Sequence, residues 1–225
     1  MRLTPMTRLA SFALTLSLAV PMALTAQNAV PPGQGDAFKD TSMLKLPAGQ
    51  RAAIFDFEDL ECPACARAFP ISHAAIDHYK IPLLRHDFLI PGHIWSRDAA
   101  ITARYLQDKV SPELGEQFRR DIFANQISIA SKDDLQGYTR KWFQTHNQQM
   151  PFVMDPSGRF AAEVQADDTL GQRLGVRETP TIIVLAPHGW TQVKDITQLY
   201  SVIDNALAET PDKPAAHPVH KPTQH

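Results

Sequence analysis

Cys62 and Cys65, in the segment Cys-Pro-Ala-Cys, are the only two cysteines of the 225-residue chain. Two thiols about one helical turn apart can close on each other, so the spacing predicts a redox-active disulfide. A structural crosslink is one alternative, but so short a loop restricts the unfolded chain very little. A zinc site is another, and it would need further Cys or His ligands that the neighbouring sequence does not offer.

The surroundings of the pair predict which cysteine attacks first. Pro63 is typical of the first turn of a helix, which would place Cys62 at the helix start. Unpaired backbone N–H groups and the positive end of the helix dipole stabilise a thiolate there. Cys65 would lie one turn inside and less exposed, which suits the resolving cysteine that attacks a mixed disulfide at Cys62.

Asp56 is the third candidate catalytic residue. It lies in the apolar run 52–57, which is typical of a strand covered on both faces. A carboxyl group in such a strand has few partners, so its pKa should rise, and it could exchange a proton with Cys65. The alternative is a carboxylate whose hydrogen bonds are satisfied at the strand end.

Strand and helix patterns alternate along the chain. Strands are expected at 52–57, 82–88 and 181–185, with 190–193 returning as an antiparallel partner of the third. Helices are expected after the capping residues Ser96, Ser111, Ser131, Ser157 and Asp195, and the fourth should end at Gly175. Few, widely separated strands imply that helices cover the sheet faces.

The two ends of the chain differ from its middle. Arg2 and Arg8 precede an apolar stretch, and small residues follow, which predicts a signal peptide over 1–26. We expect an extension at 27–50, one domain at 51–210 and a disordered Pro/His tail at 211–225. Export would place the cysteines where disulfides persist. The formal net charge of −2 gives no basic footprint for nucleic acid.

Three segments together resemble one known family. Asp56, the Cys62–Cys65 motif and the segment Gly175-Val176-Arg177-Glu178-Thr179-Pro180-Thr181 resemble the DsbA-like periplasmic thiol–disulfide oxidoreductases of the thioredoxin superfamily. The resemblance implies an α/β thioredoxin fold, with a helical insertion at about residues 95–150 between the CxxC helix and the cis-Pro strand. It also implies a cis Thr179–Pro180 bond, with both residues binding an extended substrate by strand addition.

The same resemblance implies a function. The protein would donate its disulfide to unfolded or cysteine-containing client proteins in the periplasm, without cofactor or metal. A membrane quinone-linked thiol oxidase would reoxidise it. We expect a monomer, since the segment 27–50 is too short for the dimerisation domain of the isomerase branch. A reductase or isomerase remains an alternative, and so does a metal chaperone using Cys62, Cys65 and a histidine such as His93.

Charges near the motif bear on how oxidising the disulfide is. Strongly oxidising relatives carry a histidine at the position of Ala64, and Glu178 replaces a commoner glycine. Glu58, Asp59 and Glu61 would add negative charge beside Cys62, and like charges raise the pKa of a thiol. The pKa of Cys62 is therefore expected between ~3.5 and ~7, nearer the upper value.

His86, His93 and Trp95 are expected in a loop that leads from a strand into the insertion. One of them is a candidate to face the active site or a partner.

Overall fold

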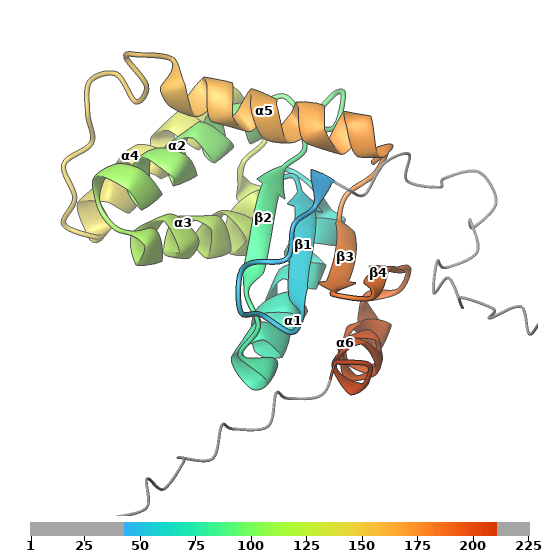
Figure 1. The fold of residues 1–225 in the computed structure, drawn as a ribbon. Helices are drawn as coiled ribbons and strands as arrows, with labels where there is room; N and C mark the ends of the chain where they lie inside the picture. Colours follow the sequence, from blue (N-terminus) through green and yellow to red (C-terminus); the bar gives the residue numbers. More distant parts are fainter. Residues whose placement is uncertain (1–42, 211–225) are drawn as a thin grey trace, which may run out of the picture.

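The computed structural model describes residues 43–210 (Figure 1). A four-stranded sheet in the order β2-β1-β3-β4 forms its centre. The strands are β1 (Ala53–Glu58), β2 (Leu83–Asp87), β3 (Thr181–Ala186) and β4 (Gly189–Val193). β1 and β2 are parallel, whereas β3 is antiparallel to both β1 and β4. All four predicted strands are confirmed, while the predicted signal peptide and the tail lie outside the described residues.

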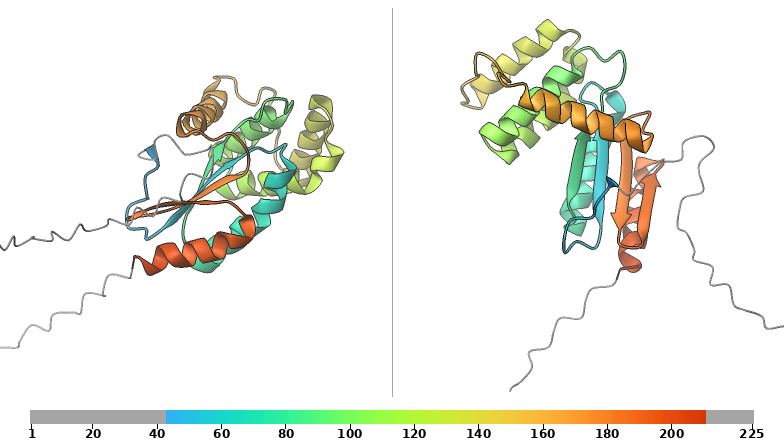
Figure 2. Two further views of the ribbon diagram at one scale, coloured as in Figure 1. Left: turned by 90° about the vertical axis from the view of Figure 1, so that its right-hand side faces the viewer. Right: turned by 45° about the horizontal axis from the view of Figure 1, so that its top comes forward.

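Six α-helices surround this sheet in the described part of the chain. They are α1 (Pro63–Tyr79), α2 (Ser96–Lys109), α3 (Pro112–Asn125), α4 (Lys132–Thr145), α5 (Arg159–Leu174) and α6 (Leu199–Ala208), with short 3-10 turns η2 (Gln126–Ser128) and η3 (Ile196–Gln198). α1 and α6 cover one face of the sheet and α5 the other (Figure 2). No helix among residues 43–210 is both long enough and apolar enough to span a membrane.

Helices α2, α3 and α4 lie together beside the β2 edge of the sheet (Figure 1). They follow the helix of the Cys-Pro-Ala-Cys segment and precede the strand that begins at Thr181. An α/β fold with a helical insertion at this point in the chain was predicted, and it is confirmed.

Side-chain alternation along β1 sets what each face of the sheet carries. Phe55 and Phe57 pack in the cluster that includes Leu174 of α5, whereas Ile54 packs with residues of α1 and α6. Because successive strand residues point to opposite faces, Asp56 shares the Ile54 face, which α1 covers. The central strand is buried at every position. A carboxyl group is thus held inside the core.

Three of the five predicted helix caps are confirmed. The Ser111 side chain accepts a hydrogen bond from the Leu114 amide, and that of Ser131 accepts one from the Asp134 amide. The Asp195 carboxylate accepts from the Thr197 amide and caps η3, which leads directly into α6. The predicted end of α5 is also right, because Gly175 has a φ of 91°, a left-handed conformation that glycine adopts without strain.

Two predicted caps are wrong, and in both an acidic residue elsewhere serves the helix start. Ser96 is the first residue of α2 rather than its cap; the cap position is Trp95, and the Glu61 carboxylate accepts from the Trp95 and Ser96 amides. α5 begins at Arg159, two residues beyond the predicted Ser157, and the Asp155 carboxylate accepts from the Ala161 amide. Local sequence patterns cannot locate the Glu61 contact, because Glu61 lies far from α2 in the chain.

Candidate active site

Cys62 occupies the cap position of α1, and Pro63 begins the helix, as predicted. Both cysteines are free thiols, with Cys62 8% exposed and Cys65 2% exposed. No side chain caps this helix start. Its unpaired backbone N–H groups therefore remain available to a negatively charged sulfur.

The other half of the site comes from the segment before β3. The Thr179–Pro180 peptide bond is cis. The Cys62 sulfur lies 3.3 Å from the Thr179 carbonyl oxygen, to which Cys62 donates a hydrogen bond when it is protonated. Thr179 and Pro180 are both partly exposed. The two segments that carried the family resemblance are thus neighbours in space.

The pKa of the Cys62 thiol is lowered to about 5. The largest cause is the Cys65 thiol, which donates a hydrogen bond to the Cys62 sulfur. Further hydrogen bonds, from the Thr179 side chain and from the backbone N–H groups of Ala64 and Cys65, also lower this pKa. Together these contacts outweigh burial, which would raise it. At neutral pH Cys62 is therefore a thiolate. The value falls inside the expected interval but lies near its middle rather than near ~7.

The expected crowding of Cys62 by acidic residues is wrong, because all three side chains bind other groups. Glu58 is buried and forms ion pairs with Arg85 and Arg119. The Asp59 carboxylate accepts hydrogen bonds from the Glu61 and Ile90 amides. The Glu61 carboxylate binds the first amides of α2, as described above. Each negative charge thus already has donors or cations around it.

Cys65 has the opposite chemistry. Burial is the main reason that the pKa of its thiol is raised, and the hydrogen bond that it donates to Cys62 raises it further. The Asp59 backbone N–H points at the Cys65 sulfur and opposes these effects. At neutral pH the pair therefore rests as a thiolate at the helix start next to a more deeply buried thiol, the asymmetry that ordered disulfide exchange requires.

Asp56 is 3% exposed, and its Oδ1 atom has no hydrogen-bond partner. Burial raises the pKa of this carboxyl group to about 8, and the nearby Glu58 adds to the effect. The predicted rise is confirmed, and the alternative of a fully satisfied acceptor is wrong. Proton exchange between Asp56 and Cys65 stays a prediction.

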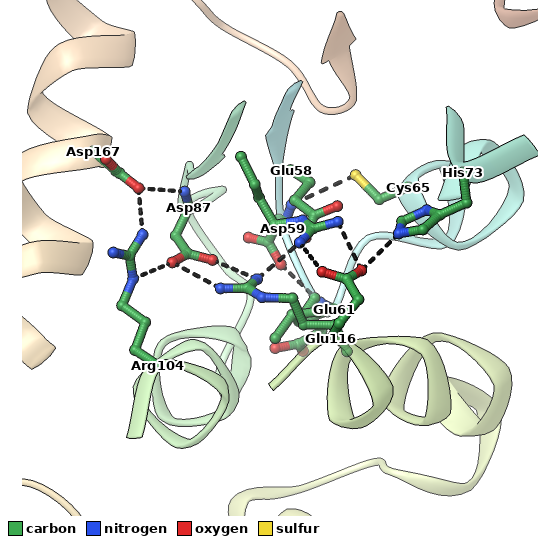
Figure 3. A network of polar contacts seen from close by, with 12 residues as sticks. Glu58, Asp59, Glu61, Cys65, His73, Asp87, Arg104, Glu116 and Asp167 are labelled. Carbon is green, nitrogen blue, oxygen red and sulfur yellow. Dashed lines mark hydrogen bonds and ion pairs between the residues drawn. The ribbon is translucent and has the colours of Figure 1, made fainter. Parts of the chain in front are cut away.

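A buried ion network lies between the sheet and the insertion (Figure 3). Its members Glu58, Arg85 and Arg119 are close enough to Asp56 to affect the pKa of that carboxyl group. Arg119 of α3 contacts Glu58 at 3.1 Å and Asp87 at 2.7 Å, and all three residues are 2% exposed. Burial would raise the pKa of Asp87, but Arg119 and Arg104 outweigh it and lower that pKa to about 2. The remaining members are paired at its rim: Arg85, Arg104, Glu116, His73 and Asp167.

Sequence reasoning missed this network. Its one visible signal was the charged run Arg85-His86-Asp87 inside a predicted strand, where apolar residues are usual. Nothing in the sequence indicated that Arg119, in the middle of a helix of the insertion, would be its centre.

The three candidates of the 86–95 segment have different surroundings. His86 lies in β2 rather than in a loop, and its ring contacts Asp167. Trp95 is buried and donates to the Ile129 carbonyl. His93 lies next to Asp59, with Nδ1 and Oδ1 3.0 Å apart. Within residues 43–210 no three His, Cys, Asp or Glu side chains are grouped as a metal site would require.

Comparisons with known proteins agree with this geometry. The thioredoxin family model matches residues 49–205. Among solved structures, BdbD from Bacillus subtilis has a TM-score of 0.58 at 20% identity, covering 77% of this chain and 96% of that one. DsbA2 from Pseudomonas aeruginosa has a TM-score of 0.55 at 18% identity, covering 72% and 92%.

A third similar structure is described as a thiol-disulfide exchange protein, α-DsbA2 from Wolbachia pipientis, with a TM-score of 0.57 at 16% identity and coverages of 72% and 84%. At these identities the likeness establishes a shared fold of the DsbA type. A comparison with curated proteins finds no sequence match.

Proposed function

The chain belongs to the thioredoxin family, and from this premise we propose that it is an exported thiol–disulfide oxidoreductase that donates the Cys62–Cys65 disulfide to client proteins. The observation that carries the proposal is the lowered pKa of Cys62, about 5, beside a buried Cys65 whose pKa is raised. A disulfide is oxidising when its reduced form is stabilised, and a stable Cys62 thiolate stabilises the reduced form.

The exchange proceeds in two displacements. A client thiolate attacks the Cys62 sulfur of the disulfide, so that Cys65 leaves as a thiolate and takes up a proton. A second client thiolate then attacks the client sulfur of the mixed disulfide, and Cys62 leaves as a thiolate. The client gains a disulfide and the enzyme becomes a dithiol. Asp56, whose pKa is about 8, is suited to give the proton to Cys65 and to take it back on reoxidation.

The client is proposed to bind as an extended strand beside Thr179 and Pro180. Thr179 is partly exposed, and its carbonyl oxygen lies 3.3 Å from the Cys62 sulfur, so a peptide paired with this backbone would bring its cysteine to Cys62. We further propose that clients are unfolded or cysteine-containing exported proteins, that the protein is a periplasmic monomer, and that a membrane quinone-linked thiol oxidase reoxidises it.

The reduction potential of the Cys62–Cys65 pair, measured in glutathione buffers, tests the proposal. A donor should fall between about −120 mV, as in the most oxidising enzyme of this type, and about −200 mV. It should also introduce a disulfide into a reduced, unfolded substrate in a stoichiometric assay, and a Cys62→Ser variant should not.

Two other outcomes would assign a different role. A potential near about −270 mV, together with rapid reduction of insulin, would indicate a reductase. Tight zinc or copper binding by the reduced protein, lost in a Cys65→Ala variant, would indicate a metal chaperone.

A further inference from the structure

Asp59 connects to both cysteines through its backbone. Its N–H donates to the Cys65 sulfur at 3.5 Å, within reach of the large sulfur atom (Figure 3). Its carbonyl oxygen accepts from the Cys62 amide at 3.0 Å. The N–H is one of two groups that lower the pKa of Cys65 against the effect of burial. It is thus placed to stabilise negative charge on the resolving sulfur.

The Asp59 side chain fixes the direction of that N–H. The side chain is 0% exposed. Oδ1 accepts from the Glu61 amide at 2.8 Å, and Oδ2 accepts from the Ile90 amide at 2.8 Å. Burial is the largest influence on this group and raises the pKa of the carboxyl, while these two hydrogen bonds oppose it. The residue is therefore held from both sides, by its own loop and by the loop after β2.

The loop after β2 is itself shaped for this contact. The His93 amide donates to the Ile90 carbonyl across Pro91 and Gly92, and Gly92 has a φ of 96°. Proline followed by a residue with positive φ is the pattern of a type II turn. The turn brings the Ile90 amide to Oδ2 and places the His93 Nδ1 atom 3.0 Å from Oδ1, although not in line for a regular hydrogen bond. The His93 side chain is 24% exposed.

We propose that Asp59 and His93 form a positioning pair for the resolving cysteine, aiming the Asp59 N–H at Cys65 and thereby stabilising the Cys65 thiolate during exchange. This inference rests on the proposed function. In the step concerned, the Cys65 thiolate attacks the Cys62 sulfur of a mixed disulfide. The Cys62–Cys65 bond forms, the bond from Cys62 to the client breaks, Cys65 is oxidised, and the client sulfur leaves reduced as a thiolate. In the donor direction Cys65 is the leaving group, and the same N–H stabilises it.

The resolving step can be measured alone. Cys62 is first converted to its mixed disulfide with 5-thio-2-nitrobenzoate, and release of the coloured thiolate then reports attack by Cys65. An Asp59→Asn substitution places an amide where two backbone N–H groups now donate, and we expect about tenfold slower release, since the amide NH2 group cannot accept the second of these hydrogen bonds. His93→Leu should slow release less, and His93→Asn, which keeps an N–H donor near the position of Nδ1, should recover most of the rate.

The controls separate positioning from general damage. His188→Leu changes an exposed histidine in the turn between β3 and β4 and should leave release unchanged. Alkylation of reduced Cys62 should stay close to the wild-type rate in the Asp59 and His93 variants. Equal slowing of alkylation and release would overturn the proposal, because it would indicate a distorted active-site loop.

The remaining outcomes are equally decisive. Wild-type release in folded Asp59→Asn and His93→Leu would overturn the proposal, and wild-type release in His93→Leu alone would remove His93 from the pair. If Asp59→Asn does not fold, the His93 variants decide. Failure of the wild type itself to release the thiolate would instead count against the proposed function.

Discussion

The Cys62 sulfur and the Thr179 carbonyl oxygen lie 3.3 Å apart, although 117 positions separate the two residues in the chain. Cys62 caps the start of α1 on one side of the sheet, and Thr179 lies in the segment that leads into β3. The contact places the nucleophile beside the backbone with which a client strand would pair. The proposed function thus places the reactive sulfur next to the backbone that would bind the client.

Cys62 should be alkylated much faster than Cys65, and with an unusual pH profile. Because the pKa of Cys62 is about 5, its reaction with iodoacetamide should stay nearly constant from about pH 8 to about pH 6.5 and fall below that. An ordinary thiol, with a pKa near ~8.5, would lose most of its reactivity as the pH falls from about 8 to about 6.5. Mass mapping of the labelled peptides assigns the site. Faster labelling of Cys65 would reverse the proposed roles.

The strands and most helices could be predicted because their signals are local. Thr181–Ala186 is an apolar, β-branched run, and Ser111 followed by Pro112 is a complete helix start within two residues. The pairing of Cys62 with Thr179 came from the family resemblance, since no local pattern relates segments so far apart.

The electrostatics of the site could not be predicted from the sequence. Glu58, Asp59 and Glu61 follow one another beside Cys62 in the chain, and proximity alone suggests that they repel a thiolate. They instead contact groups that include Arg119 for Glu58 and the first amides of α2 for Glu61, both from the insertion. The effect of a carboxylate on the Cys62 thiolate depends on the groups that surround the carboxylate in space, and these are known only from the tertiary structure.

Asp56→Asn should slow proton-coupled turnover more than the first attack. An amide cannot exchange a proton with Cys65, whereas Cys62 owes its lowered pKa mainly to a hydrogen bond from Cys65. We expect steady-state turnover with a peptide substrate to fall about 100-fold, the lower end of the range for losing general acid–base catalysis. Alkylation of Cys62 should change little. Unchanged rates in both assays would leave Asp56 without a chemical role.

The same substitution should stabilise the fold, and more so at higher pH. Burial raises the pKa of Asp56 from 3.8 to about 8. Between these values the unfolded chain is ionised and the folded chain is not, so the wild type loses stability as the pH rises from about 4 to about 8. Asn does not titrate. At ~1.4 kcal/mol per pKa unit, urea unfolding should show a gain of up to about 5 kcal/mol at pH 8 and little gain at pH 4. A gain independent of pH would contradict the raised pKa.

Arg119→Met should strongly destabilise the domain. The substitution leaves Glu58 and Asp87, both 2% exposed, without their shared cation. Removal of one partner from a buried ion pair typically costs ~3–5 kcal/mol. Arg159→Met is a matched control, because Arg159 is exposed and its contact with Asp108 is a surface ion pair; its urea midpoint should stay close to the wild type. Similar urea midpoints for the two variants would mean that the buried network does not stabilise the domain more than a surface ion pair does.

Ala64→His should make the disulfide more oxidising. Ala64 lies in the first turn of α1, and its backbone N–H already helps to lower the pKa of Cys62, but its side chain offers no donor. An imidazole there would add a hydrogen-bond donor or a positive charge near the thiolate, which should move the pKa from about 5 toward ~3.5. The pKa is measured by thiolate absorbance, and the reduction potential should rise with its fall.

Ala64→Ser is a suitable comparison, because it adds a small neutral donor and should give a smaller change in both quantities. If Ala64→His left the pKa and the potential unchanged, the residue between the cysteines would not control this site. The Cys65 thiol and the Thr179 side chain, which already lower the pKa of Cys62, would then set the potential.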